Sequence, residues 1–180
     1  MTHDAFVAMF AEVVFKPTIA AGFRFIGKSQ TIAYDAAALT VALVRLGGRF
    51  ARPGSIAHVL CARHRFLREV NELQVPLQDT TEVVDHPYKY VPSELAGLRP
   101  EKWRYIPRNL NYDHDRIAFG DRDVDVVHSE LERLQHFLVG PVRQWAAEMT
   151  PAKATEDLRT YGTGAWCERI WLEDYEKHSA

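Results

Sequence analysis

The chain has 180 residues, of which 47% are hydrophobic, so one domain over residues 1–180 can bury a core without disulfides or metal ions. Its 22 basic and 24 acidic residues are interspersed and give a net charge of -2, which makes nucleic acid a poor candidate partner. The two cysteines, Cys61 and Cys167, indicate no disulfide framework. No apolar run approaches the ~20 residues that span a bilayer. We expect a cytoplasmic protein with no membrane partner and no cofactor.

The N-terminal segment has the periodicity of an amphipathic helix from Asp4 to Lys16. The residues of its apolar stripe are Phe6, Met9, Phe10, Val13 and Val14. Pro17 is predicted to kink or restart this helix because proline lacks the amide donor. Gly22 is predicted to end it, and a single strand is expected from Phe23 to about Tyr34.

Two apolar runs, Ala36 to Leu46 and Ser55 to Leu67, flank the turn-rich segment GGRFARPG. This arrangement predicts two antiparallel strands that pair with each other. Both runs are apolar at odd and at even positions, which is typical of central strands covered on both faces.

The segment from Glu69 to Pro100 has few apolar residues, and we expect it to be a long surface excursion. Short strands are predicted at Trp103 to Ile106 and at Ile117 to Phe119. After Gly120 an apolar stripe at helical spacing predicts a helix. Its members are Val124, Val127, Leu131, Leu134 and Leu138.

Gly140 and Pro141 are predicted to break that helix. Two shorter helices, Val142 to Met149 and Pro151 to Tyr161, are expected after the break, the second with Thr150 as its cap. A last helix is expected from about Ala165 to Lys177. Strands between helical ends favour an α+β fold, with a mainly antiparallel sheet on which an N-terminal helix and several C-terminal helices pack.

Two patterns resemble metal sites, and in each the local structure favours another explanation. His58, Cys61 and His64 have ligand-like spacing, but on a strand residues three apart point to opposite faces. The acidic residues from Asp121 to Glu132 partly match a calcium loop, yet Val126 stands where that loop needs glycine. We therefore predict no metal, and we interpret the acidic residues as a helix start.

Candidate binding residues lie at the strand ends and in the aromatic second half of the chain. Arg45, Arg63, Arg65 and Arg68 are at the ends of the two core strands, where a hairpin could gather some of them beside His64 as an anion site. Trp103 and Tyr105, next to Arg104 and Arg108, have the composition of a protein interface. The predicted binding residues are Arg45, His64, Arg65, Trp103, Tyr105 and Arg108, and no catalytic residue is assigned.

Several segments together resemble a bacterial family, the domain of unknown function 4304. The resemblance lies in FKPTIAAGFRFIGKSQTIAY, in LTVALVRL, in HRFLRE and in the terminal helices. It implies a compact α+β domain without an assigned activity or cofactor, and it transfers no catalytic residue.

No nucleotide-binding loop, nucleophile elbow or zinc-protease motif occurs in the chain. We therefore expect a non-catalytic protein-binding module of the bacterial cytoplasm, with toxin immunity or phage defence as candidate roles. The alternative is an enzyme acting on a phosphate-bearing or nucleotide substrate through a pocket of His, Arg and carboxylate groups. A third possibility is a structural homodimer subunit.

Overall fold

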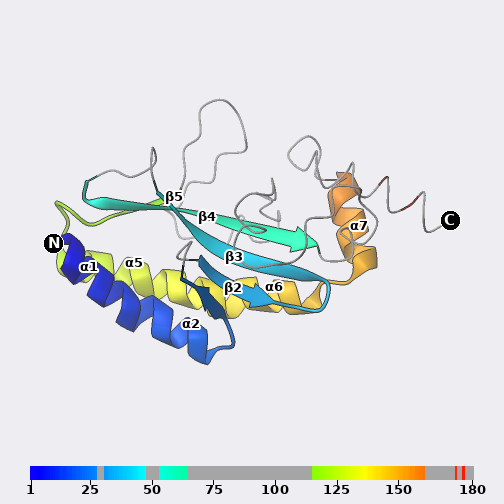
Figure 1. Ribbon diagram of the computed structural model, residues 1–180, viewed down its shortest axis with the longest axis horizontal. Helices are drawn as coiled ribbons and strands as arrows, with labels where there is room; N and C mark the ends of the chain where they lie inside the picture. Colours follow the sequence, from blue (N-terminus) through cyan, green and yellow to red (C-terminus); the bar gives the residue numbers. More distant parts are fainter. Residues whose placement is uncertain (28–30, 48–52, 65–114, 161–172, 174–175, 177–180) are drawn as a thin grey trace.

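The computed structural model describes residues 1–27, 31–47, 53–64, 115–160, 173 and 176. Within them, five strands form one sheet in the order β1-β2-β3-β4-β5, and every neighbouring pair is antiparallel. Helices from both ends of the chain lie along one face of this sheet (Figure 1). The predicted α+β class is confirmed. Among the described helices, none is both long enough and apolar enough to cross a membrane.

The N-terminal helix is continuous through Pro17. It comprises α1 (His3–Phe10), the π-helical segment η1 (Ala11–Phe15) and α2 (Lys16–Ala20). The wider π turn leaves room for the proline ring, which clashes with the preceding turn of a regular α-helix. The predicted stop at Gly22 is confirmed: Gly22 has φ +94°, and the Phe23 amide donates to the Thr18 carbonyl at 3.1 Å, as in a Schellman cap.

The prediction of one strand from Phe23 to Tyr34 is wrong. The segment forms two strands, β1 (Arg24–Ile26) and β2 (Thr31–Asp35), which pair with Arg24 opposite Ala33. The sequence between the two strands, GKSQ, is rich in residue types that favour turns, a signal that the single-strand prediction did not weigh.

The centre of the sheet is the predicted hairpin of β3 (Leu39–Leu46) and β4 (Ser55–His64). Their register pairs Leu39 with His64 and Arg45 with His58. Odd-numbered residues of β3 face the helices, and even-numbered residues face the other side. The described apolar residues of both sets are buried, as the sequence predicted: Leu43 is 2% exposed and Val44 is 1% exposed.

The predicted helix break at Gly140 and Pro141 is also wrong. The helix α5 (Val124–Phe137) continues through the π-helical segment η4 (Leu138–Val142), which contains Pro141, into α6 (Arg143–Glu148). A π turn again accommodates the proline. The cap at Thr150 is confirmed, because its hydroxyl accepts from the Lys153 amide at 3.2 Å before α7 (Pro151–Thr160).

The core lies between the sheet and the helices. The edge strand β5 (Asp115–Ala118) confirms the short extended stretch predicted there, and α5 packs against η1 on the helical layer. The stripe predicted for α5 contributes Val127, Leu131, Leu134 and Leu138 to this core, whereas Val124 is exposed. Residues of the N-terminal helix and of β1 to β4 together line a cavity between the two layers.

Candidate functional site

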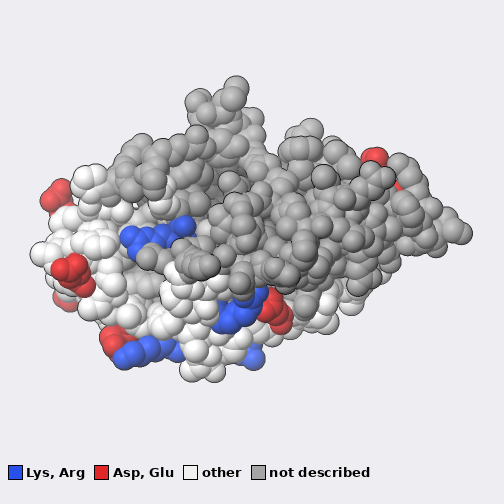
Figure 2. Space-filling view, in the orientation of Figure 1, with Lys and Arg blue, Asp and Glu red and all other residues white. Residues whose placement is uncertain are grey.

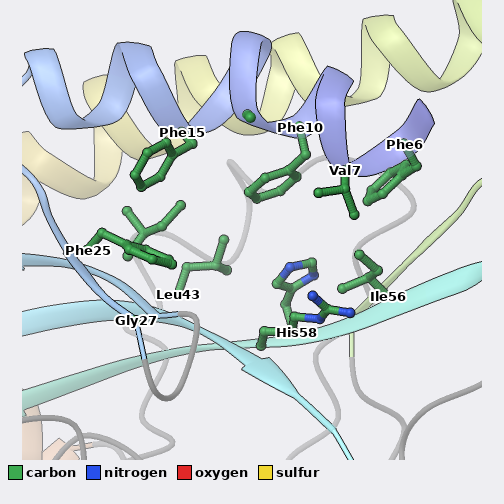
Figure 3. Close-up of a pocket in the computed structure, with 12 residues that line it drawn as sticks. Phe6, Val7, Phe10, Phe15, Phe25, Gly27, Leu43, Ile56 and His58 are labelled. Atoms are coloured by element: carbon green, nitrogen blue, oxygen red, sulfur yellow. The ribbon is translucent and has the colours of Figure 1, made fainter. Parts of the chain in front are cut away.

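A cavity of about 390 Å³ lies between the N-terminal helix and the sheet. Side chains from the helix point down into it and side chains from the strands point up into it (Figure 3). The helix contributes Phe6, Val7, Phe10, Ala11 and Phe15. The sheet contributes Phe25, Gly27, Ile32, Leu43, Arg45, Ile56 and His58. Apolar groups thus form most of the wall, and four of them are phenylalanine rings.

The cavity opens to solvent. Val7 is 43% exposed and Phe25 is 47% exposed, although both line the cavity. Phe15 and Phe25 face each other edge to face, with ring centroids 4.9 Å apart. Exposed apolar side chains that gather around an apolar cavity are typical of ligand sites, whereas single exposed ones elsewhere on the surface are ordinary.

The polar lining residues lie together at one end. Arg45 of β3 and His58 of β4 are directly paired in the sheet register, and such pairs place both side chains on the same face with Cα atoms about 4.5 to 5.5 Å apart. Asp115 of β5 is paired with His58 on the other side. These three residues are consecutive partners in the sheet register, and Arg45 and His58 line the cavity.

His58 is 3% exposed. Its imidazole stacks on the Phe10 ring, with centroids 6.0 Å apart and planes 9° apart. Burial, and secondarily the positive charge of Arg45, lowers the pKa of His58 from 6.5 to about 3. His58 is therefore neutral at physiological pH, and the guanidinium of Arg45 is the only cationic group among the described lining residues.

The residues predicted to bind an anion are not gathered into one site. Arg45 and His64 lie at opposite ends of the β3–β4 pair, because His64 is opposite Leu39 and Arg45 is opposite His58. Six positions along a strand correspond to about 20 Å. Arg65, Trp103, Tyr105 and Arg108, together with the predicted excursion from Glu69 to Pro100, lie outside the described residues.

The spacing His58, Cys61, His64 falls on strand β4, as predicted. Of the three side chains, only that of His58 is described, and it lines the cavity beneath the helix. In the part of the chain that the structure describes, no three His, Cys, Asp or Glu side chains form a group that could hold a metal ion.

Charged side chains are scattered over the described part of the face shown in Figure 2. On the face shown in Figure 2, both signs occur in small separate groups among uncharged residues. This distribution lacks the continuous basic stripe that binds a phosphate backbone.

The sequence contains a signal for this site, although the prediction did not pair Arg45 with His58. Arg45 and His58 each stand within a run of apolar residues, VALVRL and IAHVL, and a polar residue in such a run needs a specific environment. The aromatic residues of the N-terminal helix have a periodicity that is equally typical of core residues, and Phe25 has no distinguishing pattern around it.

No protein-family model, curated protein or solved structure matches the chain. The resemblance to the domain of unknown function 4304 therefore remains an expectation from the sequence, and the geometry of the cavity is the main guide to function.

Proposed function

We propose that the protein is a binding module that holds a small, mainly apolar molecule between its N-terminal helix and its sheet. The open cavity carries this proposal. Its volume of about 390 Å³ is within the usual range of small-molecule sites, which are lined mostly by apolar and aromatic side chains with a few polar groups.

The composition of the wall favours binding over acid–base catalysis. A general acid or base works best when its pKa is near the working pH, whereas the pKa of His58 is lowered to about 3. The alternative is an enzyme with a pocket of His, Arg and carboxylate groups. The cavity does contain a histidine and an arginine, His58 and Arg45, but the lowered pKa of His58 makes it poorly suited to proton transfer at neutral pH.

The protein-binding role predicted from the sequence, in toxin immunity or phage defence, remains a separate prediction. It depends on Trp103, Tyr105 and Arg108, which the structure does not describe. A binding role is common to both proposals, and they differ in what is bound.

A neutral fluorescent probe such as N-phenyl-1-naphthylamine tests the proposed function, because its emission rises when it enters an apolar site. The matched variants are Ala11→Leu and Ala8→Leu. Ala11 lines the cavity, whereas Ala8 is exposed on the same helix and is not part of the lining. Both variants add the same side chain to the N-terminal helix, so they share any effect on helix propensity.

We expect the wild-type protein and Ala8→Leu to bind the probe equally. Ala11→Leu should weaken binding by about tenfold, because added methyl groups occupy the space and overpacking costs about 1 kcal/mol or more. Circular dichroism verifies that both variants are folded. Equal binding by all three proteins, or no binding by any, would contradict the proposal.

A further inference from the structure

We infer that the ligand is an amphipathic monocarboxylate, with its apolar body among the phenylalanine rings and its carboxylate at Arg45 and His58. This inference rests on the proposed function, since it names the ligand class of the same cavity. Its basis is the separation of the wall into a large apolar part and a small polar end.

The polar end fits an anion of low charge. Arg45 is the only cation among the described residues of the wall, and a guanidinium binds a carboxylate through two parallel N–H donors of its planar fork. The group has five N–H donors, so it can hold a carboxylate on two of them while others keep contacts within the protein. A phosphate group carries about -1.5 to -2 charge at pH 7, which a single guanidinium neutralises only in part.

His58 complements Arg45 at this end. The two residues are directly paired across β3 and β4, so one anion can contact both side chains. A neutral imidazole has one N–H donor, and Phe10 stacks on its ring. This contact restricts the rotation of the imidazole beside the guanidinium of Arg45.

The apolar end fits an aromatic or aliphatic body. Phe15 and Phe25 form an edge-to-face pair that lines the cavity, and aromatic rings pack favourably in such arrangements. A molecule with a phenyl group at one end and a carboxylate at the other therefore matches the wall at both ends. A neutral molecule of the same shape would match only the apolar part.

Isothermal titration calorimetry with 6-phenylhexanoate and 6-phenylhexanamide tests this inference, because the two compounds differ only in the charged group. The wild-type protein should bind the carboxylate about tenfold or more tightly than the amide, as expected for a charge-assisted hydrogen bond. Arg45→Gln should remove this preference while leaving the affinity for the amide nearly unchanged.

Arg24→Gln is the matched control. Arg24 is paired with Asp35 and does not line the cavity, so its removal should preserve the preference for the carboxylate. Arg45→Lys keeps the charge without the planar fork and should give an intermediate preference. If Arg45→Gln does not fold, the carboxylate preference of Arg45→Lys still tests the role of Arg45.

The outcomes separate the two proposals. Equal affinity of the wild-type protein for the carboxylate and the amide would overturn the ligand class and leave the proposed function standing. A preference that persists in Arg45→Gln would overturn the role of Arg45. Failure of both compounds and of the neutral probe to bind would overturn the proposed function, and this inference with it.

Discussion

The Phe10 ring lies nearly parallel to the His58 imidazole, with the planes 9° apart and the centroids 6.0 Å apart. Phe10 belongs to the N-terminal helix and His58 to the central strand β4, so this contact joins the two walls of the cavity. A buried neutral histidine in such a position links the protonation of the site to the stability of the whole fold.

The first prediction concerns this linkage. His58 has a pKa of about 3 in the folded protein, against 6.5 as its ordinary value. As the pH falls below 6.5, the unfolded chain binds a proton that the folded chain does not bind. The free energy of unfolding should therefore decrease, by about 1.4 kcal/mol per pH unit from this group alone.

Urea unfolding of the wild-type protein and of His58→Phe, at about pH 7.5 and about pH 4.5, measures the effect. Arg45 and Asp115, the ionisable residues paired on either side of His58, are present in both proteins. The wild type should lose roughly 2 to 3 kcal/mol more than the variant over this interval. Identical pH dependence of the two proteins would show that His58 is not neutral and buried.

The second prediction concerns the close approach of Gly54 to Gly120. Gly54 has φ +68°, and a Cβ atom placed on it would lie 2.9 Å from the Gly120 Cα. Gly54→Ala should lower the free energy of unfolding by roughly 1 to 3 kcal/mol, because it adds both backbone strain and a backbone clash.

Gly140→Ala is the control for that change. Gly140 lies in the helical segment η4, and a Cβ atom there would meet nothing within 4 Å. This substitution should stabilise the protein by about 0.5 to 1 kcal/mol, since alanine loses less conformational entropy in a helix. Thermal unfolding of both variants should give shifts of opposite sign, and shifts of the same sign would refute the explanation.

The third prediction compares a partly buried ion pair with an exposed one. Arg122 donates to the Glu130 carboxylate at 2.6 Å, and the Glu130 side chain is 9% exposed. Arg122→Ala should cost about 1 to 3 kcal/mol because it removes a charged partner from a buried carboxylate. Lys16→Ala, which breaks an exposed pair with Glu12, should cost less than about 0.5 kcal/mol. Equal costs in chemical denaturation would contradict this difference.

Local patterns were sufficient to predict the hairpin of β3 and β4, the class of the fold and the apolar stripe of α5. They failed at Pro141, because a helix that packs along its length can absorb a proline in a π turn, and the sequence does not reveal that packing. They also failed at the turn between β1 and β2, where the strand pattern of Phe23 to Tyr34 concealed a reversal of the chain.

The candidate site was harder to predict, because it depends on the register between distant strands. Arg45 was predicted beside His64, and the observed register places it beside His58 instead. A shift in the pairing of two strands changes which side chains meet. The cavity also depends on which strands the N-terminal helix covers, and no local pattern specifies that choice.

The last prediction separates ligand binding from packing. Phe25 lines the cavity but is 47% exposed, whereas Phe6 lines the cavity and is fully buried. Phe6→Ala should cost about 3 to 5 kcal/mol of stability, as expected for a buried ring. Phe25→Ala should cost about 1 kcal/mol of stability or less, yet it should weaken binding of the neutral probe roughly three- to tenfold, since one aromatic contact is worth about 0.5 to 1.5 kcal/mol.

Urea unfolding and a fluorescence titration on the same samples provide both quantities. If Phe25→Ala binds the probe as well as the wild type does, the exposed ring at the rim serves no ligand. Its contact with Phe15 would then be local packing between the helix and the edge of the sheet.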